Sequence, residues 1–127
     1  MAYLRKEKYT AVVIGIGRIG LLLESDPIRL KPATHFGMWK SCKRVEFKAV
    51  CDNNPENLKI AKTKLPSVKT YLSVEELLRD IRPDIVSIAT WKDTHYEMMK
   101  LCLDHGVQAI VCEKPIAEHY EHAKEIV

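Results

Sequence analysis

The sequence lacks the long apolar runs that a membrane protein or a secreted precursor needs. No run approaches the ~18 residues that cross a bilayer, and Met1 to Thr10 leads only into a short apolar stretch at 11–14 before Gly15. We therefore expect neither a membrane span nor a secretory signal. Only five glycines and six prolines occur among the 127 residues, which excludes a low-complexity chain.

Cysteines and charges also lack the patterns that mark other classes of protein. The four cysteines, Cys42, Cys51, Cys102 and Cys112, form no C-x-x-C pair, and we expect four buried thiols in a reducing cytoplasm. The formal net charge is only +3, spread along the chain without a block of about five like charges. We therefore expect no nucleic-acid partner.

Two pairs of candidate metal ligands, Cys102 with His105 and His119 with His122, have the i, i+3 spacing of one helix face. Neither pair has a second pair at a suitable spacing to complete a four-ligand site. We therefore interpret these side chains as ordinary core or surface residues and expect no metal.

Apolar runs of strand length alternate with segments of helical period, which is the pattern of an α/β protein. The first run, YTAVVI, is nearly continuous, so it predicts a strand buried on both faces. The predicted strands cover residues 9–14, 45–51, 68–71, 84–89 and 108–112. With right-handed crossovers, residues 1–127 then form a single domain: a doubly wound, mainly parallel sheet of about five strands with helices on both faces.

Several helices have recognisable start or stop signals. Two begin with a capping box, in which a hydroxyl accepts from the helix backbone and a glutamate three residues later reaches back. The predicted helices run from Ser73 with Glu76 to Ile81, from Asn54 and Pro55 to Pro66, from Thr94 with Glu97 to Gly106, and from near Ala117 to Val127.

Residues 25–44 fit the alternation badly, because they contain Pro27, Pro32 and Gly37. The helix that should follow the first strand is therefore broken, or prolonged by an insertion. Thr34 is a candidate cap for a second, short helix carrying Phe36, Trp39 and Cys42.

A glycine loop follows the first predicted strand and precedes a predicted helix. In it, Gly15 allows a tight turn, Gly17 lets the backbone approach a pyrophosphate, and Gly20 lets the helix pack close to the sheet. The N-terminus of that helix supplies free N–H groups and a partial positive charge. The loop thus predicts a dinucleotide site, and the alternative is a tight turn with no ligand.

Asp52 ends the second predicted strand, where a carboxylate accepts the hydroxyls of an adenosine ribose. A 2′-phosphate would meet a like charge there, and neither Asn53 nor Asn54 supplies a cation, so NAD is favoured over NADP. The alternative is that Asp52 merely caps the following helix. Gly20 and Asp52 are 32 residues apart, whereas about 20 is usual, and the excess matches the irregular 25–44 stretch.

Polar residues follow the fourth and fifth predicted strands, at ATWKDTH (89–95) and CEKP (112–115). Ligands of a doubly wound sheet lie beyond the carboxyl ends of its strands. Lys114, held on a strand end beside Pro115, is placed to polarise a carbonyl or hydroxyl next to a nicotinamide. The alternative is a surface lysine that follows a strand.

Together these segments resemble the N-terminal domain of the glucose–fructose oxidoreductase/inositol dehydrogenase (Gfo/Idh/MocA) family. The resemblance rests on the glycine loop after YTAVVI, VCD at 50–52, YLSVEELLRD at 71–80, PDIVSIAT at 83–90 with His95 after it, and VCEKPIAE at 111–118. The EKP motif combined with T-x-x-x-x-H is far more specific than the glycine loop alone.

The resemblance implies an oxidoreductase that transfers a hydride between NAD(P) and a hydroxyl carbon of a sugar, polyol or related small molecule. Lys114 would be the catalytic residue, touching both nicotinamide and substrate, and Glu113 would lie near the nicotinamide ribose. Thr90 and His95 would shape the loop over the cofactor. The expected cofactor-binding residues are Gly15, Gly17, Arg18, Ile19, Gly20, Asp52, Asn53, Thr90, Trp91, His95, Glu113 and Lys114.

The resemblance also implies a following α+β domain, absent from this chain, that binds substrate, supplies a second acid/base and mediates homo-oligomerisation. The 127 residues alone are then expected to be inactive. The competing hypothesis is a stand-alone, non-catalytic module that binds NAD and regulates a partner.

This sequence departs from the family pattern at two places. Trp91 stands where the family usually has proline after the threonine, and an indole there would stack on a ligand or dock the missing domain. Residues 25–44 are longer than in simple members. Within them, THFG at 34–37 is either a device near the pyrophosphate or part of a surface insertion with no role.

Overall fold

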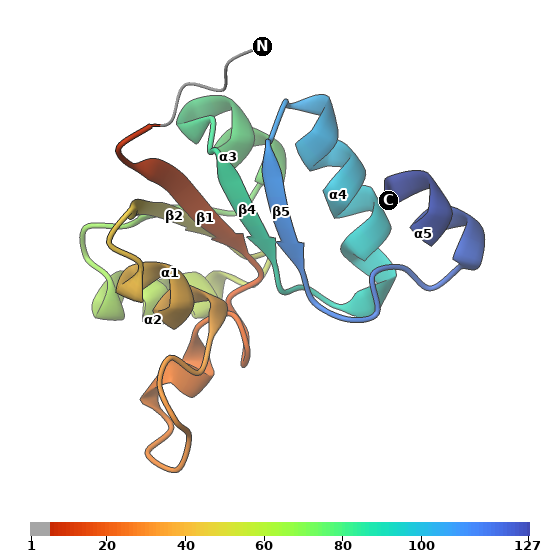
Figure 1. Cartoon of the computed structure of the whole chain (residues 1–127). Coiled ribbons are helices and arrows are strands. Elements are labelled where there is room, and N and C mark those ends of the chain that lie inside the picture. The colour runs from red at the N-terminus through yellow and green to blue at the C-terminus, as the bar shows by residue number, and fades with distance from the viewer. Residues whose placement is uncertain (1–5) are drawn as a thin grey trace.

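A computed structural model describes residues 6–127 and contains a five-stranded parallel sheet between two layers of helices (Figure 1). The strands are β1 (Tyr9–Ile14), β2 (Val45–Cys51), β3 (Lys69–Tyr71), β4 (Ile85–Ile88) and β5 (Ala109–Cys112). The helices are α1 (His35–Ser41), α2 (Pro55–Lys64), α3 (Val74–Ile81), α4 (His95–Asp104) and α5 (Tyr120–Ile126), with short 3-10 helices η1 (Leu22–Ser25) and η2 (Lys92–Thr94). Part of the segment in which we expected no secretory signal lies outside the described residues.

The strand order β3-β2-β1-β4-β5 makes the sheet doubly wound, as predicted. The chain moves outward from β1 to β3 on one side, then returns across β1 and continues through β4 to β5. Helices α1 and α2 cover one face, and α3 and α4 cover the other (Figure 1). The direction of winding therefore reverses between β1 and β4, which is where doubly wound sheets bind ligands.

The central strand β1 is buried on both faces, as its continuous apolar run predicts. Val12 and Ile14 join the core under α3 and α4, whereas Val13 joins the core under α1 and α2. Val12 and Val13 are wholly inaccessible to solvent, and each such burial contributes about 1.5–3 kcal/mol. No helix within residues 6–127 is long and apolar enough to cross a membrane.

Most of the predicted helix signals are confirmed. Ser73 Oγ accepts from the backbone N–H of Glu76 at 3.3 Å, and Asn54 Oδ1 accepts from that of Glu56 at 3.0 Å. Thr34 Oγ1 caps α1 by accepting from Gly37 N at 3.1 Å. Gly106 has φ +73° directly after α4, which is the left-handed conformation that the stop signal requires.

The break predicted in the helix after the glycine loop is confirmed, whereas one capping prediction is wrong. Only the four-residue η1 follows the glycine loop, and the chain then leaves through a loop whose Ile28 and Leu30 are exposed. Thr94 forms no capping box, because its hydroxyl donates to the Trp91 carbonyl and is also hydrogen-bonded to Thr90 Oγ1, both at 2.7 Å. The Thr94 hydroxyl is thus bonded to the loop after β4 and is not available to cap α4.

Two smaller expectations also need correction. Helix α5 begins at Tyr120 rather than near Ala117. The four thiols are all free, but they are not all buried: Cys51 and Cys102 are buried, Cys112 is half-buried, and Cys42 is exposed. Cys42 immediately follows α1, in the exposed connection that leads to β2.

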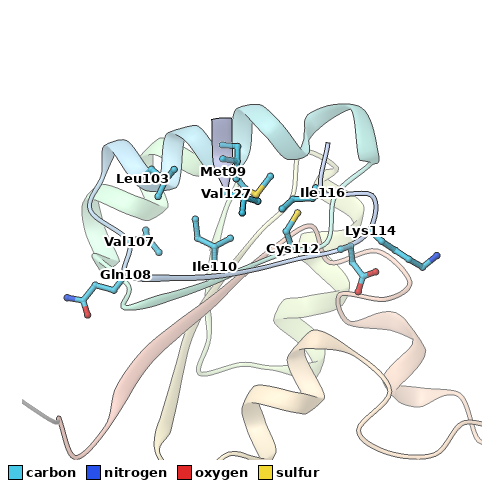
Figure 2. Close-up of a pocket in the computed structure, with 11 residues that line it drawn as sticks. Met99, Leu103, Val107, Gln108, Ile110, Cys112, Lys114, Ile116 and Val127 are labelled. Carbon is cyan, nitrogen blue, oxygen red and sulfur yellow. The ribbon is translucent and has the colours of Figure 1, made fainter. Parts of the chain in front are cut away.

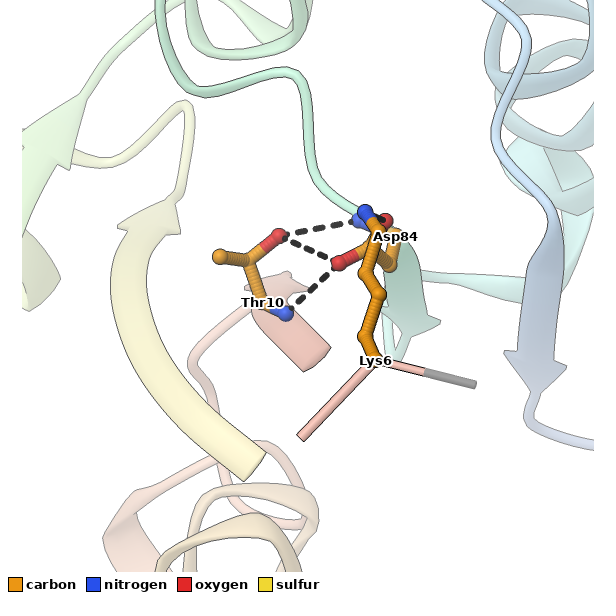
Figure 3. Close-up of polar contacts among 3 residues, drawn as sticks. All are labelled: Lys6, Thr10 and Asp84. Carbon is orange, nitrogen blue, oxygen red and sulfur yellow. Dashed lines mark hydrogen bonds and ion pairs between the residues drawn. The ribbon is translucent and has the colours of Figure 1, made fainter. Parts of the chain in front are cut away.

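At the amino-terminal ends of β1 and β4, Asp84 joins two segments that are far apart in the sequence (Figure 3). Its carboxylate accepts from Lys6 Nζ at 2.5 Å, from Thr10 N at 2.9 Å and from Thr10 Oγ1 at 3.1 Å. Burial raises the pKa of the Asp84 carboxyl, but the hydrogen bonds from Lys6 and Thr10 outweigh it and leave the pKa below its usual value. The ionised side chain therefore stabilises the fold.

Replacing Asp84→Asn should lower the free energy of unfolding at pH 7 by about 1–3 kcal/mol, because the charged hydrogen bonds are lost. A carboxyl with a depressed folded pKa contributes fully above its unfolded pKa of about 3.9 and loses that contribution as pH falls through the folded value. The difference from the parent should therefore shrink below about pH 4. Urea unfolding at several pH values measures it, with Asp104→Asn as an exposed control. A difference that does not change with pH would contradict the assignment.

Candidate cofactor-binding site

The predicted site residues meet at the carboxyl edge of the sheet, because a row of backbone hydrogen bonds brings the five strand ends level. Asp52 N donates to Tyr71 O at 3.1 Å, and Gly15 N donates to Cys51 O at 2.8 Å. Ala89 N donates to Ile14 O at 2.8 Å, and Glu113 N donates to Ile88 O at 2.9 Å. The loops after β1, β2, β4 and β5 therefore begin side by side.

Glycine is required where the loops after β1 and β4 touch. Gly15 has φ +86°, and a Cβ there would lie 2.7 Å from the Ala89 carbonyl and 2.8 Å from Thr90 N. A Cβ on Gly20 would overlap the Gly15 carbonyl oxygen. At Gly17, by contrast, a Cβ would meet nothing within 4 Å. The loop is therefore closed on the protein side at Gly15 and Gly20 and open at Gly17.

The backbone N–H groups of residues 17–20 lie at this open part of the loop. Within the described part of the chain, none of these four N–H groups has a hydrogen-bond acceptor. The following turn is closed by Leu22 N, which donates to Gly17 O at 3.0 Å. A run of unpaired N–H groups at the start of a helical turn is an anion-binding arrangement. Since η1 is one turn long, the N–H groups rather than a helix dipole supply the attraction.

Asp52 braces the glycine loop. Its Oδ2 accepts from Ile16 N at 3.0 Å and from Asn57 Nδ2 at 3.2 Å, and its Oδ1 accepts from Asn54 N at 2.8 Å. The cap of α2 is Asn54, so Asp52 does not serve as that cap. A carboxylate has about four acceptor positions, which leaves one position of Oδ1 for a ligand hydroxyl.

The loop after β4 presents an exposed aromatic ring. Trp91 is 84% exposed, whereas the neighbouring Thr90 is half-buried and its hydroxyl is hydrogen-bonded to Thr94 Oγ1. An ion pair between Lys92 and Glu118 ties this loop to the segment after β5. The contacts of Thr90 and Lys92 therefore hold the backbone on both sides of the Trp91 indole.

His95 lies beneath the loops and does not face the edge. It is 1% exposed, and its Nδ1 and Nε2 lie 2.7 Å from Pro115 O and 3.0 Å from Thr90 O. The ring thus connects the loop after β4 to the EKP segment after β5. The expected role of shaping the loop matches this placement better than direct contact with a cofactor.

Glu113 and Lys114 differ in how firmly they are held. The Glu113 side chain is 33% exposed, and its Oε1 lies 2.8 Å from Nε2 of His35. Lys114 is exposed, and its side chain points away from the apolar hollow between α4, β5 and α5 (Figure 2). That hollow, of about 450 Å³, is lined mainly by apolar side chains such as Met99, Ile110 and Val127.

The remaining predicted residues surround the glycine loop. Arg18 and Asn53 are exposed, and Ile19 is half-buried with its carbonyl accepting from His35 N at 3.0 Å. His35 is not among the expected cofactor-binding residues, although THFG at 34–37 is one candidate for a device near the pyrophosphate. Spacing could not show which strand end the His35 ring would meet.

The cysteines near this edge do not supply nucleophiles. Burial raises the pKa of the Cys51 and Cys102 thiols to about 12 and that of Cys112 to about 11, with the Asp52 carboxylate adding to the effect at Cys51 and that of Glu113 at Cys112. All three thiols are therefore protonated near neutral pH. No group of three or more metal-ligating side chains occurs among the described residues.

Residues 9–127 match the model of the Gfo/Idh/MocA oxidoreductase family, which describes an NAD-binding Rossmann fold. The chain belongs to this family. The resemblance drawn from the glycine, EKP and T-x-x-x-x-H motifs is thereby confirmed, as is the Rossmann fold class. The matched range includes the irregular 25–44 segment.

Several proteins similar to this chain are named as dehydrogenases. D-apiose dehydrogenase of Rhizobium rhizogenes is 33% identical over 89 residues, which make up 70% of this chain and 26% of that protein. D-glucoside 3-dehydrogenase of Escherichia coli is 29% identical over 82 residues, or 65% of this chain and 23% of that protein. The chain thus spans about a quarter of the length of these relatives.

Solved structures agree with this fold. The WlbA dehydrogenase of Chromobacterium violaceum, in complex with NADH and UDP-GlcNAcA, has a TM-score of 0.77 at 27% identity, covering 97% of this chain and 32% of that one. An oxidoreductase of Agrobacterium radiobacter, in complex with NAD+, L-tartaric acid and magnesium, has a TM-score of 0.74 at 26% identity, covering 94% and 31%.

Replacing His95→Ala should lower the free energy of unfolding by about 2–4 kcal/mol, because it leaves a cavity and two carbonyls without their partner. His105 is a matched control, since its Nδ1 also lies near one carbonyl, Leu101 O at 2.9 Å, but its side chain is exposed. His105→Ala should cost less than about 1 kcal/mol. Chemical denaturation of both variants checks the comparison, and equal losses would contradict it.

Proposed function

We propose that this chain is the NAD(H)-binding domain of an oxidoreductase acting on a hydroxyl carbon of a sugar, polyol or related small molecule. The observation that carries the proposal is the run of unpaired N–H groups at residues 17–20, beside an open Gly17 and the Asp52 carboxylate. These groups match two neighbouring polar parts of an adenosine diphosphate, its pyrophosphate and its ribose.

The pyrophosphate lies over Gly17 in this proposal. Its oxygens accept from the N–H groups of residues 17–20, and the missing side chain lets the phosphate approach the backbone. Arg18 is exposed at the same turn and adds positive charge. Ile19 contributes its N–H, while its carbonyl is already bound to His35.

Asp52 selects NAD over NADP. The remaining acceptor position of Oδ1 takes a hydroxyl of the adenosine ribose, and a 2′-phosphate would be repelled by the carboxylate. Asn53 is exposed at the same end of β2 and supplies no cation. The NADH and NAD+ complexes of the two solved relatives support this preference.

The nicotinamide end lies toward the loops after β4 and β5. Thr90 and Trp91 border it from β4, with the exposed indole available to stack on a ring. Glu113 accepts from the nicotinamide ribose, and His95 supports both loops from below. These roles are the ones that the family resemblance implies, and the residues that would fill them lie together at the carboxyl edge of the sheet.

Lys114 is the proposed catalytic residue. When bound, the nicotinamide supplies the hydride acceptor or donor for the hydroxyl carbon. The exposed ammonium of Lys114 has the freedom to reach the substrate oxygen, hold it by a hydrogen bond and stabilise negative charge there. The second acid/base comes from the following α+β domain, which also binds substrate and forms the homo-oligomer.

The relatives favour a catalytic protein over the regulatory-module alternative, because those named by activity are dehydrogenases. The 127 residues alone are then inactive, since they hold the cofactor and one catalytic group without the substrate domain. The four free thiols fit a cytoplasmic protein.

The variant Gly17→Val tests the cofactor site. A side chain at Gly17 has room in the protein itself but would occupy the space above the N–H groups. We therefore expect unchanged thermal stability and a loss of NADH affinity of at least about 100-fold by calorimetry. Gly106→Ala, at an open but left-handed position far from the site, should show the reverse: lower stability and normal affinity. A Gly17→Val protein that binds NADH normally would refute the proposed site.

The variant Asp52→Asn tests the choice of cofactor. Removing the charge should weaken NAD binding by about 1–3 kcal/mol, because a charge-assisted hydrogen bond is lost. NADP should bind no worse, since the repulsion of its 2′-phosphate disappears at the same time. Parallel titrations with NAD and NADP give the ratio of affinities. An equal loss for both cofactors would show that Asp52 acts only by bracing the glycine loop.

A further inference from the structure

The insertion after η1 extends away from the sheet and then returns to the glycine loop at the carboxyl edge of the sheet. Ile28 and Leu30 are each 92% exposed at the outer part of the loop, which protrudes below the sheet in Figure 1. Glu24 holds the returning chain: its Oε2 accepts from Thr34 Oγ1 at 2.5 Å and from Ala33 N at 3.0 Å. The insertion is therefore clamped at its base while its tip extends into solvent.

The first turn of α1 is seated directly on the glycine loop. His35 N donates to Ile19 O, and Phe36 N donates to Gly20 O, each at 3.0 Å. Gly37 has no space for a Cβ, because the Glu24 carboxylate lies against it. These contacts fix the backbone of His35 relative to the loop that binds the pyrophosphate in the proposed function.

The ring of His35 then reaches the end of β5. It is 7% exposed, and its Nε2 lies 2.8 Å from Glu113 Oε1, across 78 residues of sequence. A carboxylate only accepts hydrogen bonds, so Nε2 carries the hydrogen and donates. Nδ1 is buried and has no partner among the described residues, which favours the ring with its hydrogen on Nε2 alone.

We propose that His35 is a positioning residue that acts through Glu113. Its hydrogen bond holds one carboxylate oxygen of Glu113, and the carboxylate, still one-third exposed, keeps the other oxygen turned toward the ligand. A glutamate side chain that is already held in one conformation loses less conformational entropy on binding a hydroxyl than a freely rotating one does. The inference rests on the proposed function, since it assigns Glu113 a ribose hydroxyl.

Two substitutions of His35 separate positioning from packing. His35→Phe keeps a ring of similar size and removes the donor. His35→Gln places an amide N–H near the position of Nε2 and restores the donor. On the 127-residue chain, we expect His35→Phe to weaken NADH binding about tenfold, as for the loss of one interaction worth about 1.4 kcal/mol, and His35→Gln to recover most of it.

A double-mutant cycle with Glu113→Ala decides whether the effect passes through Glu113. In the Glu113→Ala background, His35→Phe should change NADH affinity less than about twofold, because the group that it positions is gone. Equal losses in both backgrounds, or no loss in the parent, would overturn the inference. If the parent chain binds no NADH at all, the proposed function fails, and that result is distinct from either of these.

Nitrogen-15 NMR of the histidine rings tests the contact without relying on a folded His35 variant. In the parent chain, the His35 ring should carry its hydrogen on Nε2, and the Nε2 signal should shift in Glu113→Gln. A hydrogen on Nδ1 alone, or no response to Glu113→Gln, would overturn the inference even if His35→Phe does not fold.

Discussion

The row of four backbone hydrogen bonds along the carboxyl edge of the sheet is the constraint on which the rest of the site depends. Each bond joins the end of one strand to the next, from Tyr71 O through Cys51 O and Ile14 O to Ile88 O. Because all five strands are parallel, this one row brings the glycine loop, Asp52, Thr90 and the EKP segment to the same edge. The chemistry assigned to these segments requires that alignment, since none of them alone contacts more than part of a dinucleotide.

Close backbone contact shapes the edge, and buried or half-buried polar side chains hold it. Gly15 and Gly20 let the loop after β1 lie against its own backbone and against Ala89, at distances that no Cβ permits. Asp52 and the two buried histidines then connect one loop to another. A rigid frame of this kind leaves only a few groups, among them Trp91 and Lys114, exposed to meet a ligand or a further domain.

Much of the fold was predictable because its signals are local. Continuous apolar runs located the strands to within a residue or two, and the caps Ser73, Asn54 and Thr34 act on backbone only two or three residues away. One capping prediction failed because a second local partner competes. Thr94 has the spacing of a capping box, but its hydroxyl bonds to Thr90 and Trp91, only four and three residues before it. The helix after the glycine loop stops after one turn, as Pro27, Pro32 and Gly37 in the insertion predict.

The sequence by itself determined the strands of a doubly wound sheet, the position of the glycine turn and the family motifs, since periodicity and glycine spacing reflect local geometry. The tertiary structure alone decided which side chains support the site. Asp52 reaches Ile16 N across 36 residues, and His35 reaches Glu113 across 78. Such pairs depend on where an irregular insertion returns and how strand ends align. Both are set by packing and hydrogen bonding between segments whose spacing in the sequence carries no record of their contact.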